Sequence, residues 1–220
     1  DTIAFCNSTL KHKSGIFYSA LDADSEGEEG KYYTWSWQEW KEAVKENNEI
    51  AQEYFGIQEE GNWEGVNILH RAYDLEQLAS KHKLNVQEIK SAIQKLSVVL
   101  FAKRQQRIPP LTDDKSLLSW NALMNMALVK AAITLSNDSY LLQAKALMDA
   151  MLSAFLKDGK LLHVWKNDEA KIAAHLDDYA YLIQALIQLG IAIADEYYLL
   201  KAKTLTSILI DEFSHESSPM

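Results

Sequence analysis

Cysteine is nearly absent from this sequence, and positive charge is in the minority. The single cysteine, Cys6, cannot form an internal disulfide, and this scarcity favours a reducing compartment, so we expect a cytoplasmic protein. Lysine and arginine number 22 against 31 aspartates and glutamates, which gives a formal net charge of −9 at pH 7. No stripe of basic residues with interleaved aromatics is present, so nucleic acid is not an expected partner.

Long uninterrupted apolar runs are absent as well. The longest apolar stretch, residues 180–194, is interrupted by Gln184 and Gln188 and is shorter than the roughly 20 residues of a membrane-spanning helix. A membrane is therefore not an expected partner, and such stretches are interpreted as buried helices. With 220 residues, of which 48% are hydrophobic and 24% charged, the chain has the composition of a folded soluble protein with a substantial core.

The most informative feature that is present is an internal repeat. Residues 140–145 (YLLQAK) return as residues 198–203 (YLLKAK), and each copy follows a stretch that opens with paired aspartates. The second aspartates of these pairs, Asp114 and Asp178, are 64 residues apart (178 − 114). A unit of this length holds two helices that cannot bury their apolar faces alone, so neighbouring copies must stack. Because corresponding helix starts then point toward the same end, Asp114 and Asp178 are expected to be near neighbours.

Two predicted helical hairpins, 113–156 and 177–213, contain this repeat. The first helix of each is apolar over most of its circumference, which indicates an interior helix, whereas the return helices carry a polar face. This inner and outer layering predicts an all-α fold, a partial α/α toroid of stacked hairpins that forms a single domain over residues 1–213. Residues 214–220 are predicted to be a frayed tail.

The remaining residues contain shorter elements. Aromatic and β-branched runs on both sides of an acidic turn predict a small β-hairpin-like element at 15–35. Ser36 and Glu39 have the spacing of a capping box ahead of a helix. The first residues, 1–6, are typical of the end of a helix, so we expect the chain to be a piece of a longer protein. The other predicted elements are helices over 37–47, 49–55, 74–82 and 85–107, a loop over 61–70, a strand over 160–165 and a turn over 166–168.

Four segments, taken in chain order, are characteristic of one family. They are residues 19–30 (SALDADSEGEEG), 60–69 (EGNWEGVNIL), 113–121 (DDKSLLSWN) and 176–180 (LDDYA). With them the chain resembles the YyaL and spermatogenesis-associated protein 20 family, whose members couple an N-terminal thioredoxin-like domain to an α/α six-hairpin barrel related to sugar epimerases and glycosidases. The resemblance implies that this chain is part of the barrel and has a six-hairpin glycosidase-like fold. It also implies that the chain acts on carbohydrates.

The resemblance also implies a partner, the thioredoxin-like domain of the parent protein. This chain itself has no Cys-x-x-Cys motif and has room for about half of a six-hairpin ring. It departs from the family pattern at Ile16 and Ala122, where glycine is more usual. It departs again at His175, where an apolar residue is common, which weakens a catalytic assignment for His175.

The paired aspartates have two interpretations. Aspartate at a helix N-terminus caps free N–H groups and complements the helix dipole. Two inward carboxylates on adjacent inner helices are also the arrangement that glycoside chemistry needs, one as acid and one as base or nucleophile. Asp114 and Asp178 are the predicted catalytic pair, because each directly precedes the apolar part of its helix. His70 is a candidate general base of the kind that sugar epimerases use, with His163 and His175 in reserve.

Several further residues are predicted to bind a sugar. Indole rings stack on the apolar faces of sugars, while carboxylates and amides fix hydroxyl groups. Core packing is the alternative for Trp120, whereas a loop flanked by glycines has little packing reason to carry Trp63 and Glu64. The predicted substrate-binding residues are Trp63, Glu64, Asn67, Trp120, Asn121, Asp22 and Asp24.

The acidic turn at 22–27 resembles the first half of a calcium-binding loop. Asp22, Asp24 and Glu26 stand at alternate positions before Gly27, but position twelve of such a loop would be Tyr33 rather than a bidentate glutamate. A solvated acidic turn is the main interpretation, and a calcium site is the alternative. No His/Cys spacing indicates zinc, and no motif predicts a cofactor.

Two functions follow from these patterns. The first is a carbohydrate-active domain, glycosidase-like or epimerase-like, that uses carboxylate and histidine acid–base chemistry on a sugar or glycoside. The second is a non-catalytic module that binds a ligand or a partner, including the thioredoxin-like domain. Half a ring exposes inner-helix surface, which a second copy of the chain would also cover, so a homo-oligomer is a third expected association.

Overall fold

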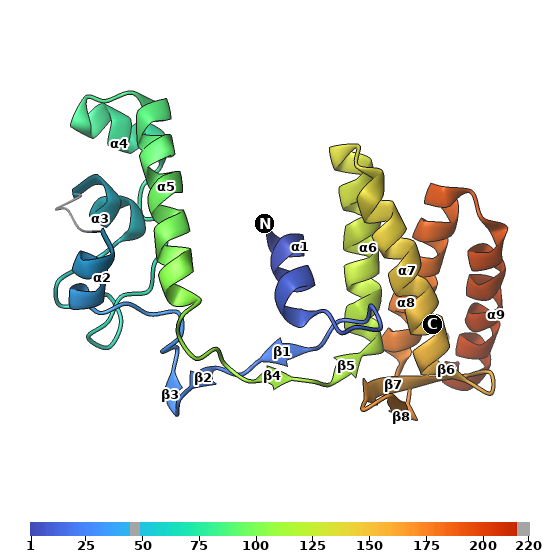
Figure 1. The fold of residues 1–220 in the computed structure, drawn as a ribbon. Helices are drawn as coiled ribbons and strands as arrows, with labels where there is room; N and C mark the ends of the chain where they lie inside the picture. The colour runs from blue at the N-terminus through green and yellow to red at the C-terminus, as the bar shows by residue number, and fades with distance from the viewer. Residues whose placement is uncertain (45–48, 215–220) are drawn as a thin grey trace. The chain divides into compact units, whose positions relative to one another are not determined.

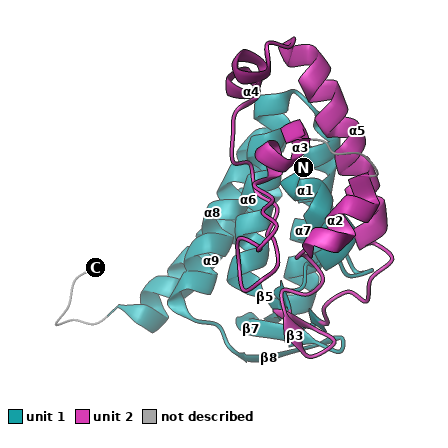
Figure 2. Cartoon of the chain, turned by 90° about the vertical axis from the view of Figure 1, so that its left-hand side faces the viewer, with its two compact units in different colours: residues 1–21, 112–220 teal, residues 22–111 magenta. Residues whose placement is uncertain are grey.

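The computed structural model describes residues 1–44 and 49–214, and helices account for most of them (Figure 1). The fold is all-α with small β elements, as the sequence predicts. The chain divides into two compact units (Figure 2). Unit 1 comprises Asp1–Leu21 and Thr112–Met220, and unit 2 comprises Asp22–Leu111. The predicted tail at 214–220 lies, apart from Ser214, outside the described residues.

Unit 1 contains two long helical hairpins and a small sheet. The predicted hairpin at 177–213 is confirmed, with helices that end at Ile193 and Phe213. Its elements are α1 (Thr2–Phe5), the π-helix η1 (Cys6–Leu10), β1 (Ala20–Leu21), β4 (Thr112–Asp113), β5 (Ser116–Leu117), α6 (Leu118–Leu135), α7 (Asp138–Phe155), β6 (Leu156–Lys157), β7 (Lys160–Lys166), β8 (Glu169–Ala173), α8 (Leu176–Ile193) and α9 (Glu196–Phe213).

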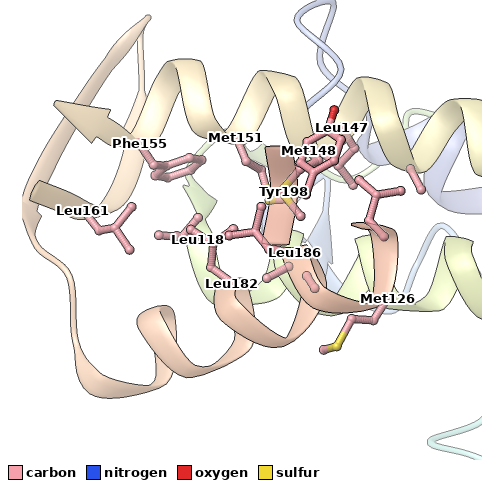
Figure 3. Close-up of a cluster of buried hydrophobic side chains, with 14 of the residues drawn as sticks. Leu118, Met126, Leu147, Met148, Met151, Phe155, Leu161, Leu182, Leu186 and Tyr198 are labelled. Atoms are coloured by element: carbon pink, nitrogen blue, oxygen red, sulfur yellow. The ribbon is translucent and has the colours of Figure 1, made fainter. Parts of the chain in front are cut away.

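The two hairpins of unit 1 stack side by side. Helices α6 and α8 pack on each other, and each also packs on its return helix, α7 or α9. Two hydrogen bonds tie neighbouring elements: Tyr198 Oη on α9 donates to Asp149 Oδ1 on α7 at 2.6 Å, and Asn7 Nδ2 in η1 donates to Gln143 Oε1 on α7 at 3.0 Å. The shared core is shown in Figure 3 and includes Leu118, Met126, Leu147, Met148, Met151, Phe155, Leu161, Leu182, Leu186 and Tyr198.

Strand β7 is the centre of the sheet in unit 1. It pairs antiparallel with β5, β6 and β8, and in the β5 pairing Ser116 lies opposite Trp165. Leu161 and Trp165 are buried against the helices, whereas Lys166 is exposed, which is the alternation of a sheet with one solvated face. His163 lies between the two buried residues on the strand, so it points to the helical side.

The predicted start of α6 is wrong by four to five residues. Asp113 belongs to β4, which pairs with β1 through Ala20, and Ser116 and Leu117 belong to β5, so the helix begins only at Leu118. Pairing with strands distant in sequence determines the conformation of this segment, and a local helical pattern cannot reveal such pairing. The strand at 160–165 and the turn that follows it are confirmed.

Unit 2 has its own core around four helices. Predicted helices at 49–55 and 74–82 are confirmed, as is the capping box, in which Glu39 Oε2 accepts from Ser36 N at 2.9 Å. The elements are β2 (Asp24–Ser25), β3 (Glu28–Glu29), α2 (Trp37–Val44), α3 (Glu49–Phe55), α4 (Leu75–His82) and α5 (Val86–Arg104). The core residues are Trp35, Trp40, Ala43, Ala51, Ile57, Leu78, Ala79, Ile89, Ile93 and Leu100.

Two predictions in unit 2 need correction, and one extends beyond the described residues. The helix expected over 85–107 ends at Arg104, because residues 105–107 turn away. Of the β element expected over 15–35, only 24–29 forms a hairpin, since residues 31–33 form a turn and β1 pairs with β4 instead. The helix predicted over 37–47 is described to Val44, and its last predicted residues lie outside the described part.

Helices α6 and α8 are long enough and apolar enough to cross a membrane by length and composition. Within the structure, half of the residues of α6 and 39% of those of α8 are buried, and both helices contribute to the core of unit 1. A core helix of a soluble protein meets the same criterion, so this finding is weak evidence for a membrane.

Candidate functional site

Asp178 lies at the centre of a hydrogen-bond network beneath the first turns of α6 and α8. Its side chain is completely buried. Oδ1 accepts from Ser119 N at 3.0 Å, and Oδ2 accepts from His175 N at 2.9 Å. Asp178 therefore caps its own helix from the third position and also caps the neighbouring helix α6, which is the capping interpretation of the paired aspartates and not the catalytic one chosen for Asp178.

The same carboxylate orients a histidine. His163 Nδ1 on β7 lies 2.7 Å from Asp178 Oδ2, and the side chain of His163 remains 21% exposed. His175 lies beside it, with ring centroids 4.5 Å apart and planes tilted by 52°. The contact to a carboxylate assigns the proton of neutral His163 to Nδ1 and leaves a lone pair on Nε2. Two imidazoles and one carboxylate are thus brought together from β7 and the start of α8.

Asp114 does not join this group, which corrects the prediction of a catalytic pair. It lies in the turn between β4 and β5, not at a helix start, and its half-exposed carboxylate pairs with Lys166 Nζ at 2.5 Å. Lys166 and His163 are three residues apart on β7, so they project from opposite faces of the strand. The side chains of Asp114 and Asp178 consequently reach opposite sides of the sheet rather than one cavity.

The two predicted binders on α6 have different surroundings. Trp120 is 53% exposed, so the alternative of core packing is wrong for this residue. Asn121 is buried and holds the backbone of Phe17, accepting from its N–H at 2.8 Å and donating to its carbonyl at 3.0 Å. Asn121 is therefore a structural clamp between α6 and the segment after η1, and its amide is not free for a ligand.

Asn67 and His70, in unit 2, are structural as well. Asn67 is completely buried, accepts from Gln58 N at 2.8 Å and donates to Gln58 O at 3.0 Å, which closes the loop around it. His70 Nδ1 lies 3.2 Å from Ile68 O, and its ring occupies the space where a Cβ on Gly56 would stand. His70 belongs to unit 2, whereas Asp178 belongs to unit 1, and no carboxylate of the described residues orients the His70 ring.

Asp22 and Asp24 are exposed, and their contacts are local. Asp22 Oδ1 accepts from Asp24 N at 3.3 Å, which is a turn interaction. Glu26 reaches Lys31 at 3.6 Å instead of its two neighbours. Among the described residues no three histidines, cysteines, aspartates or glutamates are close enough to hold one metal ion, so the calcium alternative has no geometric support.

Trp63 and Glu64 line a cavity in unit 2. The cavity has a volume of about 720 Å³ and is bounded by the β2–β3 hairpin, the segment after it and the residues that follow α5. Trp63 and Val66 exchange backbone hydrogen bonds at 2.9 Å, so residues 63–66 form a tight turn. Its central residues, Glu64 and Gly65, have φ values of 47° and 80°. That Trp63 and Glu64 bind a ligand stays a prediction; the structure shows that both residues line this cavity.

Two important residues carried no strong sequence signal. His163 stood in reserve because a single histidine on a strand has no motif, and only the spatial contact with Asp178 distinguishes it. Arg107 looked like the end of a helix, but its guanidinium donates to the carbonyls of Lys31, Tyr32 and Thr34. Neither contact could be read from spacing, since the partners are 15 and at least 73 residues away.

Comparison with known proteins places the chain among a few relatives. No family model matches it. An uncharacterized protein of Caenorhabditis elegans is 30% identical over 90% of this chain, and human spermatogenesis-associated protein 20 is 27% identical over 82%. The mouse spermatogenesis-associated protein 20 is 26% identical over 85% of the chain.

The chain spans only about a third of the length of these relatives, from 28% to 32%. Their names assign neither an activity nor a ligand. The resemblance predicted from the sequence motifs is confirmed: along most of its length, this chain is related to the spermatogenesis-associated protein 20 family.

Proposed function

We propose that unit 1 is a carbohydrate-active domain of the sugar-epimerase-like kind, with His163 as the general acid–base and Asp178 as the residue that positions it. The proposal includes the view that the α6–α7 and α8–α9 hairpins are two units of an α/α toroid. One observation carries it: a completely buried carboxylate holds Nδ1 of a partly exposed histidine at 2.7 Å.

This contact gives His163 the properties of a general base. The carboxylate holds the proton on Nδ1 and stabilises the imidazolium that forms when Nε2 accepts a proton. In an epimerisation, Nε2 removes the proton from the carbon next to the carbonyl of an open-chain sugar. The electron pair of the broken C–H bond moves to the carbonyl oxygen as an enediolate. A solvent water then protonates the same carbon on its other face, and the imidazolium returns its proton to the hydroxide left behind, which gives the epimer and restores His163. No oxidant or reductant is consumed.

A glycosidase mechanism is less well supported. It needs two carboxylates about 5 to 10 Å apart across an open cavity. Asp178 is completely buried and accepts three hydrogen bonds, and Asp114 is paired with Lys166 beyond the sheet. Since no second carboxylate of the described residues is found facing Asp178, a single histidine is the better candidate for proton transfer.

Aromatic side chains near the dyad support a carbohydrate as the substrate class. Trp120 follows Ser119, whose N–H donates to Asp178, and it is 53% exposed. Tyr181, three residues after Asp178 on α8, is also exposed, at 37%. Trp120 and Tyr181 thus lie within one helical turn of Ser119 and Asp178, the residues behind His163, and exposed aromatic rings are a suitable surface for the apolar face of a sugar ring.

The test is hydrogen exchange at carbon. The chain is incubated in D₂O with a panel of reducing monosaccharides, and proton NMR follows loss of the signal next to the carbonyl and growth of epimer signals. His163→Gln is expected to lower the exchange rate by about 100-fold or more. His82→Gln, an imidazole in unit 2, is the control and should leave the rate unchanged. No exchange with any sugar, or equal rates in wild type and His163→Gln, would refute the acid–base role.

A second candidate is the non-catalytic module, and the surface of the same helices favours it. Several large apolar residues on α6 and α8 are exposed, among them Leu123, Ile133, Ile187 and Ile191. A thioredoxin-like domain of a parent protein or a second copy of this chain would cover such a surface. Absence of exchange, together with a concentration-dependent rise in mass by analytical ultracentrifugation, would favour this function over the first.

A further inference from the structure

Unit 2 contains a cavity that the proposed function does not use. It measures about 720 Å³, and its wall combines the aromatic rings of Tyr32 and Trp63 with the apolar side chains of Val66 and Ile108 and a set of charged groups. The volume is within the range of small-molecule sites. Every lining residue belongs to unit 2, so this cavity is complete within one compact unit.

The wall of the cavity is held in place by Arg107. Its Nη1 donates to the carbonyls of Tyr32 at 3.0 Å and Thr34 at 2.6 Å, and Nη2 donates to Glu39 at 3.2 Å. The guanidinium also lies 4.3 Å from the ring centroid of Trp35. The guanidinium of Arg107 is therefore bonded to groups of the protein itself. These bonds preorganise the segment after β3, and they occupy the N–H groups that an anionic ligand would need.

Negative charges outnumber positive charges on the wall of the cavity. Five glutamates line the cavity against two cations. Lys31 pairs with Glu26 at 3.6 Å and Glu28 at 3.1 Å, and Arg107 pairs with Glu39. Within the described residues, this leaves the carboxylates of Glu29 and Glu64 on the wall without an ion-pair or hydrogen-bond partner. The cavity wall thus carries two carboxylates whose negative charge no cation of the described residues compensates.

The turn at 63–66 presents one of these carboxylates together with the indole. Glu64 has a left-handed backbone, and Trp63 contacts Gly30, where a Cβ would stand 3.4 Å from the ring. An aromatic ring beside a free carboxylate attracts a cation that has apolar substituents, because the ring quadrupole and the carboxylate act in the same direction. A bare metal ion does not fit, since no three carboxylates in the described residues are close enough to share one.

We infer that this cavity binds an organic ammonium ion on an apolar stem, with Trp63 against the ammonium group and the methylenes next to it, and Glu29 and Glu64 beside the charge. A small amine and a lysine side chain share this chemistry. A neutral sugar is the competing ligand, because stacking on Trp63 would not require charge. The inference is independent of His163 and Asp178, which lie in the other unit.

The test uses 1,5-diaminopentane as the cationic probe, its uncharged isostere 1,5-pentanediol and methyl glucoside, each titrated into the full chain by calorimetry. We expect the diamine to bind in the millimolar range or tighter and more weakly in high salt, whereas the diol does not bind. Glu64→Gln is expected to weaken the diamine about two- to fivefold. The matched control is Glu60→Gln, which removes the same charge from an exposed residue of the neighbouring turn outside the cavity.

A further variant and probe separate the remaining outcomes. Trp63→Phe keeps an aromatic ring with a weaker quadrupole and should weaken the diamine without unfolding unit 2, which circular dichroism checks. A second probe, Nα-acetyl-lysine amide, keeps the charged ε-ammonium group of a lysine side chain. Its binding, compared with that of the diamine, distinguishes a lysine side chain from a free diamine as the source of the cation. Equal binding of diamine and diol, equal weakening by Glu60→Gln, preference for methyl glucoside, or no binding of any amine would overturn the inference.

Discussion

At the scale of single residues, Asp178 shows how one carboxylate can serve two roles. It accepts two backbone N–H groups from α6 and α8 and one histidine ring nitrogen while completely buried. Its position in a capping box could be predicted from sequence because capping follows local spacing. The contact with His163 could not, since a strand register and a helix start determine it together.

Asp178→Ala is expected to destabilise unit 1 by about 3 kcal/mol, because one buried donor, Ser119 N, and two part-buried donors lose their acceptor. Asp114→Ala, which removes a half-exposed ion pair, should change the free energy of unfolding by less than about 1 kcal/mol. Urea unfolding of both variants measures the difference. Similar losses in both would mean that the network around Asp178 does not hold the helix starts together.

Glu64 is the second informative residue. Its backbone adopts a φ of 47°, a left-handed conformation that costs glycine and asparagine less free energy than it costs glutamate. Glu64→Asn should therefore stabilise unit 2 by up to about 1 kcal/mol while it weakens the diamine in the cavity. Thermal unfolding measures the first effect, with Glu60→Asn as the control. A destabilised Glu64→Asn variant would show that the carboxylate contributes to the fold.

At the scale of elements, long helices were predictable and short strands were not. The apolar period of α8 and α9 extends over five turns, so their bounds follow from the sequence nearly to the residue. The two-residue strands β1, β4 and β5 have no period, and they exist because distant partners supply their hydrogen bonds. For that reason the predicted start of α6 was wrong, and so was the predicted position of Asp114 at a helix start.

Two tyrosines that pack between helices make the stability of the hairpins depend on pH in the alkaline range. Burial raises the pKa of Tyr179 and of Tyr198 above the usual 10.0, and the bond from Tyr198 to Asp149 adds to the second shift. The folded state favours the neutral phenols, so this contribution is complete below pH 10 and is lost as the pH rises through the raised values.

Unit 1 should consequently lose stability above pH 10 more steeply than a variant that cannot ionise there. Urea unfolding between pH 8 and pH 11 measures the slope, and Tyr179→Phe with Tyr198→Phe should flatten it. Tyr73→Phe, an exposed position, is the control. An unchanged slope in the double variant would mean that these phenols ionise as readily in the folded chain as in the unfolded one.

At the scale of the whole molecule, the two units have separate cores, one built around α6 to α9 and one around α2 to α5. Leu78→Ala, at a completely buried position in unit 2, should cost about 2 to 5 kcal/mol there. Hydrogen exchange should then accelerate in α4 and α5 and stay unchanged in α6 and α8. Leu186→Ala should give the reverse pattern. Acceleration throughout the chain in either variant would show one cooperative unit.

The pairing of β1 with β4 sets an order of events during synthesis. Leu21 lies opposite Thr112, so all of unit 2 is inserted between two paired residues of unit 1. Residues 22–111 leave the ribosome as a continuous stretch and hold a complete core before α6 to α9 have left it. Residues 1–21 precede unit 2 in the chain but can pair with β4, Asn121 and Gln143 only after unit 2 and the first hairpin of unit 1 have been made.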